Sequence, residues 1–291
     1  MTKFFQAAAM VLVLPLLAHR PAAAGEVGTS ACFKGPTGLV LYSLRDMQNK
    51  EGVAAVLDKT KAFGFKYVEV SGLGGLTPAE FKAQLNRRGL VPVGTHFGYD
   101  RLRDDPAGAA REARVLGLPQ AGCAWIPHKD PFDEKTCRAA AAVFNRAGAV
   151  FAKHGLRFYY HTHGYEFQPH GQGTLFDLLA AETDPKTVFF QMDVLWVVLP
   201  GQDPVKLLEK YPQRWLLMHL KDLRKGVPLG NMSAHTALEN DVAIGTGQID
   251  WTSLLKAAQA VGVKYYLIED ESPAVVEQIP VSLRFLESVS W

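Results

Sequence analysis

The stretch HTHGYEF at residues 161–167 decides the fold, together with three later stretches of the same kind: QMD (191–193), MHLKD (218–222) and LIEDE (267–271). Each has the pattern of the C-terminal end of a buried strand and contains, at that end, His, Asp or Glu residues, whose side chains bind metals. In a barrel of parallel strands, residues at those ends converge on one cavity, so carboxylates and imidazoles far apart in the sequence share a divalent cation. The four stretches predict a metal-dependent enzyme.

Short apolar runs alternate with segments of helical periodicity along the chain. The predicted strands are Leu39–Leu44, Tyr67–Ser71, Val91–His96, Gln120–Trp125, Arg157–His161, Val188–Asp193, Trp215–Lys221 and Tyr265–Glu269. A capping residue followed by Pro predicts helix starts at Thr77, Asp105, Asp203 and Ser272, and Asp250 is a further predicted cap. Eight such repeats predict a (β/α)₈ TIM barrel. An open doubly wound sheet is the alternative, but no Gly-rich phosphate fingerprint follows the first strand.

The first 24 residues have the pattern of a secretory signal peptide. Lys3 precedes an apolar run over residues 7–18, and three alanines precede Gly25 as a cleavage site. The run is too short to span a bilayer. We therefore expect one mature domain over residues 25–291, periplasmic or secreted and not bound to a membrane.

The charge of the mature chain bears on its partners. Removing residues 1–24 takes away Lys3 and Arg20 and no acid, which leaves 29 basic and 29 acidic residues. A neutral chain argues against nucleic-acid binding. The three cysteines, Cys32, Cys123 and Cys137, form no CxxC pair. Buried inert thiols are the favoured interpretation, with one disulfide as the alternative.

Three residues of the later strands are candidate metal ligands. Asp193 ends the apolar run VFFQMD, where an acid is costly unless it pairs or binds a metal, with a helix cap as the alternative. His219 lies in an otherwise apolar strand, with Lys221 on the same face. Glu269 has the phase of a barrel-interior residue. Lys221 is placed to stabilise a developing oxyanion; pairing with Asp222 or Glu269 is the structural alternative.

The end of the fifth strand offers three further candidates. His161 and His163 share a face by the period of two, and Glu166 lies in the loop that follows, from which it can curl back over the cavity. Any of the three is a candidate ligand. Two histidines hydrogen-bonded at a barrel rim are the structural alternative.

The chain resembles the xylose isomerase-like TIM-barrel superfamily of sugar isomerases and epimerases, which includes inosose dehydratases and endonuclease IV. The resemblance covers essentially the whole mature chain, through YSLRD (42–46), GFKYVEV (64–70), GTHFG (94–98), HTHGYEF, MDVLW (192–196), GQDP (201–204), HLKD (219–222), GTGQIDW (245–251) and LIEDE. It implies one divalent ion, Mn²⁺ foremost, with Mg²⁺, Co²⁺ or Zn²⁺ as alternatives. It implies Asp193, His219 and Glu269 as three of its ligands.

The sequence departs from this family at the first ligand, because the turn at Gly155-Leu156 aligns His161 with a position where many members have Glu. The arrangement HxHxxEF instead resembles the exported and inosose-dehydratase-like branch. We therefore predict Glu166 as the fourth ligand and His163 or His161 as the acid–base residue.

The predicted activity is that of a sugar isomerase or epimerase, which removes a proton next to a metal-bound carbonyl and passes through an enediolate. A lyase that eliminates a β-substituent from a keto-sugar or 3-keto-glycoside is the first alternative. The predicted partner is a small carbohydrate, and a homo-oligomer is left open. Predicted substrate contacts are Arg45, Glu69, His96, Trp125 and Trp196, each with a salt bridge or rim packing as its structural alternative.

Two other classes of protein fit parts of the pattern. A phosphodiester-cleaving enzyme of the endonuclease IV type needs more metal ligands and a basic groove, which the neutral charge does not support. A non-catalytic sugar-binding barrel would keep the aromatic residues and lose the metal set.

Overall fold

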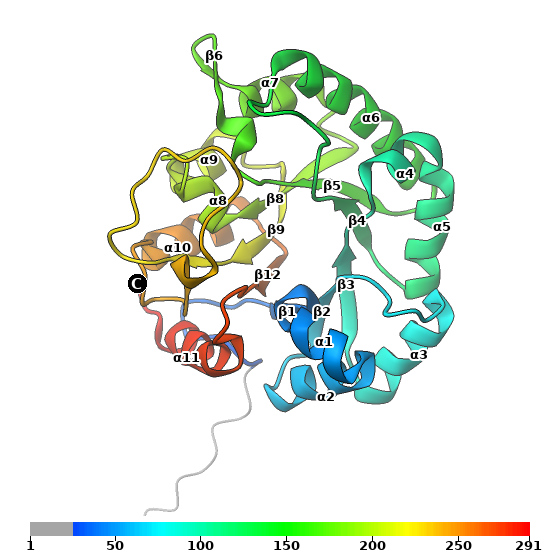
Figure 1. The fold of residues 1–291 in the computed structure, drawn as a ribbon, viewed down its shortest axis with the longest axis vertical. Helices are drawn as coiled ribbons and strands as arrows, with labels where there is room; N and C mark the ends of the chain where they lie inside the picture. Colours follow the sequence, from blue (N-terminus) through cyan, green and yellow to red (C-terminus); the bar gives the residue numbers. More distant parts are fainter. Residues whose placement is uncertain (1–25) are drawn as a thin grey trace, which may run out of the picture.

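The structure, a computed structural model, describes residues 26–291. Eight parallel strands form the centre of the molecule, and helices surround them (Figure 1). The strands are β1 (Thr37–Val40), β2 (Tyr67–Val70), β3 (Val91–Thr95), β4 (Gln120–Cys123), β5 (Arg157–His161), β8 (Val188–Asp193), β9 (Trp215–Leu220) and β12 (Tyr265–Ile268). The predicted signal peptide lies outside the described residues.

The sheet curls into a nearly closed barrel. Its order is β3-β2-β1-β12-β9-β8-β5-β4, so strands that follow one another in this set are neighbours in space. A parallel bridge between His96 and Gly122, with the Phe97 amide donating to the Gly122 carbonyl at 2.8 Å, joins β3 to β4. This architecture confirms the predicted TIM barrel.

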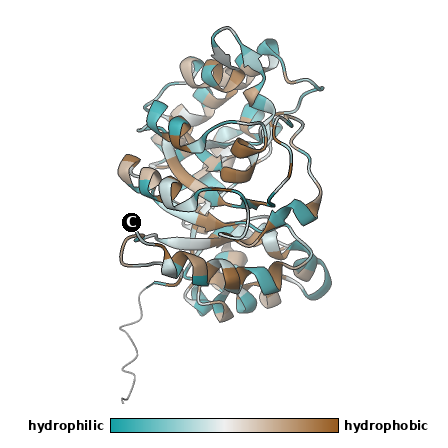
Figure 2. Ribbon diagram, turned by 90° about the vertical axis from the view of Figure 1, so that its left-hand side faces the viewer, coloured by the Kyte–Doolittle hydropathy of each residue, from teal (hydrophilic) through white to brown (hydrophobic). Residues whose placement is uncertain are grey.

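An outer layer of helices covers the strands, and hydrophobic and hydrophilic residues are mixed along this layer (Figure 2). The helices are α1 (Arg45–Glu51), α2 (Val53–Ala62), α3 (Pro78–Arg88), α4 (Tyr99–Asp104), α5 (Pro106–Leu116), α6 (Glu134–Lys153), α7 (Leu175–Glu182), α8 (Val194–Val198), α9 (Pro204–Lys210), α10 (Trp251–Val261) and α11 (Val275–Ser288). No helix among residues 26–291 is long and apolar enough to cross a membrane.

Most of the predicted helix starts are confirmed. Thr77 forms a full capping box with Glu80, and the side chains of Asp105, Asp203 and Asp250 each accept backbone N–H groups at the first turn of their helices. The prediction for Ser272 is wrong, because α11 begins at Val275 with Ala274 as its N-cap.

The first predicted strand was placed too late. The strand ends at Val40, and residues 41–44 form a 3₁₀ turn that leads directly into α1. Leu41 and Leu44 are buried in that turn, so their apolar character comes from packing and not from strand structure.

The barrel interior holds an apolar layer below its C-terminal end. Val40, Val93, Tyr159, Leu217 and Leu267 are buried together there. Larger aromatic and aliphatic side chains fill the space between strands and helices. Most polar side chains of the barrel interior lie above this layer, at the C-terminal end of the strands with the candidate ligands.

Two short strands tie down a long loop at that end. β10 (Asp222–Leu223) pairs antiparallel with β11 (Asp241–Val242), and the Arg224 amide donates to the Asn240 carbonyl at 2.8 Å. Residues 224–240 between them form the yellow loop on the left of Figure 1. A second hairpin, β6 (Pro169–His170) with β7 (Gly173–Thr174), precedes α7.

The cysteines are free thiols in the described part of the chain. Burial raises the pKa of Cys123 and of Cys137 to about 12, which keeps both as unreactive thiols at neutral pH.

Candidate functional site

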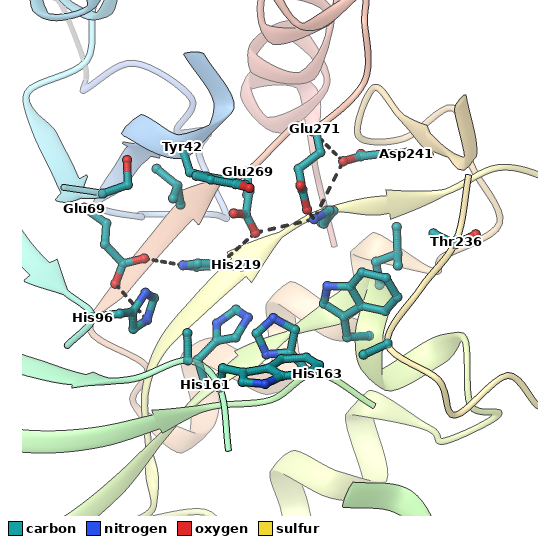
Figure 3. A pocket seen from close by; sticks show the side chains of 18 of the residues that line it. Tyr42, Glu69, His96, His161, His163, His219, Thr236, Asp241, Glu269 and Glu271 are labelled. Atoms are coloured by element: carbon teal, nitrogen blue, oxygen red, sulfur yellow. Dashed lines mark hydrogen bonds and ion pairs between the residues drawn. The ribbon is translucent and has the colours of Figure 1, made fainter. Parts of the chain in front are cut away.

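A cavity of about 560 Å³ opens at the C-terminal end of the strands (Figure 3). Its lining includes side chains that the sequence singled out, from β2, β5, β9, α8 and the loops after β3, β4, β5, β9 and β12: Glu69, His96, Trp125, His161, His163, Trp196, His219, Lys221 and Glu269. Residues 234–238 of the long loop cover part of it. Segments from all parts of the barrel therefore share one cavity.

The adjacent strands β5, β8 and β9 bring together His161, Asp193 and His219. Asp193 and His219 are register partners, and His161 pairs with Gln191, two residues before Asp193. One donor atom from each of the three side chains lies within 4.8 Å of the others, and no other such group of three occurs among residues 26–291. Glu269 joins them, because its Oε2 lies 3.0 Å from His219 Nδ1.

The separations within this group fit a divalent ion. Asp193 Oδ2 lies 3.9 Å from His161 Nε2 and 4.0 Å from His219 Nδ1. Ligands of a tetrahedral ion with bonds of about 2.1 Å lie about 3.4 Å apart, so a shift of well under 1 Å would bring these atoms onto one cation.

The two oxygens of Asp193 have different surroundings. Oδ1 accepts the Trp196 amide at 3.0 Å and caps α8, whereas the buried Oδ2 has no hydrogen-bond partner among the described residues. Burial raises the pKa of Asp193 to about 7, an effect that Lys221 opposes. A buried carboxylate oxygen without a partner is costly, and a cation at this point would satisfy it.

The two histidines of the group differ in charge. Burial, reinforced by the positive charge of His219, lowers the pKa of His161 well below 6.5, so His161 is neutral. Burial also acts to lower the pKa of His219, but Glu69 and Glu269 outweigh it and raise that pKa to about 10. Because ligands bind a metal without their proton, a metal at His219 would release the proton on Nδ1.

Glu69 lies at the floor of the cavity and is fully buried. Burial acts to raise its pKa, but His96 and His219 lower it to about 2, so the carboxylate is ionised. It accepts the Tyr159 hydroxyl at 2.6 Å and also contacts His219 Nε2. Gly94 on β3 makes room for this contact, because a Cβ there would lie 2.7 Å from both Glu69 Oε1 and the Tyr159 hydroxyl. The geometry gives Glu69 these protein partners at the cavity wall, and its contact with substrate stays a prediction.

The structure does not bring Glu166 to the cavity. Glu166 lies in a 3₁₀ turn at residues 165–167, where its Oε1 accepts the His163 amide at 2.9 Å and its Oε2 is buried without a hydrogen-bond partner among residues 26–291. Its neighbours are Tyr160, Tyr165 and Cys137, on the helix side of β5. The turn after Gly164 folds this carboxylate outward and leaves His161 as the side chain of this segment beside Asp193.

Glu166→Gln is expected to stabilise the protein at alkaline pH. Burial raises the pKa of Glu166 from 4.5 to about 7. Below pH 4.5 the carboxyl is protonated in both states, and between pH 4.5 and 7 only the unfolded chain ionises, so folding loses up to about 3 kcal/mol as the pH rises. The neutral amide avoids this loss and can still accept the His163 amide.

Urea unfolding at pH 4, 6 and 8 measures this effect. We expect equal free energies of unfolding for variant and wild type at pH 4 and a gain for the variant of about 2–3 kcal/mol at pH 8. The exposed Glu209, on α9, provides the control variant Glu209→Gln. A difference that does not change with pH would contradict the buried, protonated carboxyl.

Among the four histidines at the strand ends, which are His96, His161, His163 and His219, His163 is the one without a ring hydrogen bond to the described residues. Its ring packs against the His161 ring at 4.6 Å and the edge of Trp125 at 5.4 Å, and stacks 6.3 Å from Trp196. Neither ring nitrogen has a hydrogen-bond partner among the described residues, and Nδ1 is buried. Burial lowers the pKa of His163 to about 3, which keeps the imidazole neutral, with a lone pair on one ring nitrogen.

Lys221 also contacts Trp196, with its Nζ 5.5 Å from the indole centroid. It contacts Glu271 and lies 3.5 Å from Glu269 Oε2 and 3.9 Å from Asp241 Oδ2. Burial acts to lower its pKa, but Glu269 and the other acids raise it well above 10.5, so Lys221 is positively charged. Asp222, the other partner considered from the sequence, instead accepts the amides of Gly245 and Gly247 and the Trp251 indole N–H.

The remaining predicted contacts divide into two groups. His96, Trp125 and Trp196 line the cavity, and the Trp125 side chain is 41% exposed at its mouth. Arg45 does not line it: its Nη2 lies 3.5 Å from Glu271 Oε2, and its guanidinium stacks over Tyr42.

Sequence reasoning missed several residues of the site. Gln191 and Tyr159 stand two residues before Asp193 and His161, so the period of two could have identified both as inward-facing. Asp241 and the covering residues 234–238 come from a loop whose sequence gives no such signal.

Comparison with known proteins supports one family. The pattern of the xylose isomerase-like TIM barrel matches residues 57–289. An inosose dehydratase from Salmonella agona is 28% identical over 240 residues, which cover 72% of this chain and 77% of that protein. A second, from Geobacillus thermodenitrificans, is 31% identical over 165 residues and is matched over only 54% of its length.

Solved structures share the fold at lower identity. A sugar phosphate isomerase/epimerase from Parabacteroides distasonis has a TM-score of 0.73 and 23% identity, with 94% of this chain and 97% of that chain covered. The IOLI protein, solved with a zinc atom, has a TM-score of 0.65 and 13% identity, with 86% and 95% covered. The family pattern spans most of the residues, and the eight parallel strands form the nearly closed barrel of this fold. The chain therefore belongs to the xylose isomerase-like TIM barrel family.

Proposed function

We propose that this protein is a divalent-metal-dependent carbohydrate lyase that removes a proton next to a carbonyl and then eliminates a β-hydroxyl group. The observation that carries the proposal is that a base and a cation line the same cavity and both contact Trp196. His163 is neutral and its ring has no hydrogen-bond partner among residues 26–291, and Lys221 is a buried ammonium 5.5 Å from the Trp196 indole centroid.

The metal set that we propose is His161, Asp193, His219 and Glu269. The unpartnered Asp193 Oδ2 and the donor separations of 3.0–4.0 Å support it. When bound, a divalent ion supplies a Lewis acid that polarises a substrate carbonyl. The inosose dehydratase relatives support a keto-cyclitol or keto-sugar as the substrate class.

The side chains of the cavity then divide the work. His163 takes the proton from the carbon next to the carbonyl and returns it to the β-hydroxyl, which leaves as water and gives an enone. Lys221 donates a hydrogen bond to the oxygen on which negative charge develops, and Glu269 and Glu271 hold its ammonium in place. Trp125 and Trp196 offer apolar faces to the ring of the substrate.

An isomerase or epimerase reaction is the second candidate, and the Parabacteroides distasonis neighbour carries that description. Both reactions begin with the same proton removal. An epimerase must also return a proton from the opposite face, and Glu69 and Glu269, two carboxylates of the cavity lining, are already paired with His219. Elimination needs only one base for both proton transfers, and His163 can supply it.

Proton NMR in D₂O tests the proposal directly. Mn²⁺-loaded protein is incubated with an inosose and with a panel of keto-sugars, and we expect deuterium at the carbon next to the carbonyl in the remaining substrate together with a new enone absorbance. An isomeric product that keeps every hydroxyl would support the isomerase instead. If no compound of the panel exchanges its proton, the protein is a carbohydrate-binding barrel and the enzymatic proposal fails.

Export is a separate part of the proposal and depends on residues 1–24. Fractionation of the native host, with N-terminal sequencing of the recovered protein, tests it. We expect a mature N-terminus at Gly25 outside the cytoplasm.

A further inference from the structure

A buried pair of side chains, Gln191 and Glu69, stands between three histidines of the site. Gln191 Nε2 donates to Glu69 Oε1 at 2.9 Å. Gln191 Oε1 lies 2.8 Å from His96 Nε2 and 2.9 Å from His161 Nδ1. The other oxygen of Glu69 contacts His219 Nε2 (Figure 3). One glutamine amide and one carboxylate thus contact all three imidazoles.

The direction of each hydrogen bond follows from the chemistry of the groups. An ionised carboxylate only accepts, so the NH₂ group of Gln191 must face Glu69 and its carbonyl oxygen must face His96 and His161. A carbonyl oxygen also only accepts. Both histidines must therefore donate, His96 through Nε2–H and His161 through Nδ1–H.

This hydrogen bonding determines which ring nitrogen of each candidate histidine ligand faces the proposed metal position. With its proton on Nδ1, neutral His161 presents the lone pair of Nε2 toward Asp193 Oδ2, 3.9 Å away. His219 donates Nε2–H to Glu69, so Nδ1 faces Asp193 Oδ2 at 4.0 Å and Glu269 Oε2 at 3.0 Å. The two histidines present opposite nitrogens to the same point in space.

We propose that Gln191 and Glu69 are positioning residues that fix the tautomers of His161 and His219, so that a metal binds through His161 Nε2 and His219 Nδ1. The inference rests on the metal site of the proposed function and adds the residues that orient it. Outer hydrogen bonds of this kind hold a ligand imidazole in one tautomer and orientation. Tyr159 completes the arrangement, because its hydroxyl donates to the Glu69 oxygen that also receives Gln191.

The alternative is that Gln191 has a purely structural role. A second buried glutamine of the barrel, Gln120, has such a role and provides the comparison. Gln120 on β4 is also buried in the described structure, but its amide donates to the Val93 carbonyl at 3.0 Å and no histidine is among its hydrogen-bond partners there. Gln191→Met and Gln120→Met are therefore made as two separate variants. Met has a similar volume and makes no comparable hydrogen bonds, so the comparison separates the effect of packing from the control of the tautomer.

The experiment uses protein labelled with ¹⁵N at histidine. Long-range ¹H–¹⁵N correlation spectra of the metal-free protein report which ring nitrogen carries the proton, and a His161→Asn sample assigns the signals of His161. We expect wild type and Gln120→Met to show the Nδ1–H form of His161. Gln191→Met should show the Nε2–H form or a mixture of both.

Mn²⁺ titration by calorimetry gives the second readout. Loss of an outer hydrogen-bond partner costs about 10–100-fold in metal affinity, so we expect that weakening for Gln191→Met and less than about twofold for Gln120→Met. A wild-type His161 with its proton on Nε2 would overturn the inference, even if Gln191→Met does not fold. So would equal Mn²⁺ affinities for the two Met variants. Failure of wild-type protein to bind Mn²⁺ at all would instead contradict the proposed function.

Discussion

Asp193→Asn and His219→Ala are each expected to remove stoichiometric divalent metal from the protein while the barrel stays folded. Asp193 Oδ2 is a buried oxygen without a hydrogen-bond partner among residues 26–291, and an amide nitrogen at that place cannot bind a cation. The Asn side chain keeps an oxygen that can cap α8 through the Trp196 amide. We expect metal content below about a tenth of wild type, because even outer-shell losses cost 10–100-fold in affinity.

Elemental analysis after dialysis against Mn²⁺ measures the metal, and circular dichroism checks the fold. Asp270→Asn is the matched control. Asp270 is a buried acid next to the proposed ligand Glu269, and its Oδ1 accepts the Ser272 amide. It should keep the metal. Full occupancy in both Asp193→Asn and His219→Ala would rule out this ligand set.

The same measurement separates the two candidate ligands at the end of β5. The geometry predicts that His161→Ala loses metal and that Glu166→Gln keeps it, because the Glu166 carboxylate faces Tyr160 and Cys137. The opposite result would restore Glu166 as the ligand predicted from the sequence.

His163→Asn is expected to lower kcat by about 10²–10⁴-fold with metal content unchanged, which is the usual contribution of a general base. Asn keeps a polar side chain of similar reach but cannot take a proton at neutral pH. The loss should appear equally in the rate of α-proton exchange in D₂O, since exchange needs the base and not the leaving group.

His128→Asn is the control for the His163 substitution. His128 stacks on Trp125 at 5.2 Å, as a neighbour of the same aromatic group, but donates Nδ1–H to the Ile126 carbonyl and is not part of the cavity lining. Its variant should exchange protons at close to the wild-type rate. If His163→Asn exchanges faster than about a tenth of wild type, the base is another residue.

The sequence was a good guide wherever one face of a strand decides the position of a side chain. The bounds of β5 and β8 agree with those predicted, and the period of two places His161 and Asp193 inward. Outside strands this rule is lost. Glu166 follows Gly164, whose φ of 94° turns the chain, and nothing in HTHGYEF indicates to which side that turn carries the carboxylate.

Hydrogen-bond partners were also beyond sequence reasoning. Glu69 and Gln191 are 122 residues apart, and their contact depends on how far the barrel closes. The sequence identified Glu69 as a polar residue of the cavity, but whether it meets substrate or histidine is a question of distances that only the folded chain settles.

The loop of residues 224–240 can change during evolution, and with it the substrate that the cavity accepts, while the residues that carry out the reaction stay the same. Its ends are joined by β10 and β11, so its middle can lengthen, shorten or change sequence without disturbing the register of any barrel strand. The ligand and base candidates stand on β5, β8 and β9 and in the segments that follow β5 and β12, whereas residues 234–238 contribute only to the cover. Descendants of one ancestor can thus acquire new substrates by exchanging a single surface segment while inheriting the reactive centre intact.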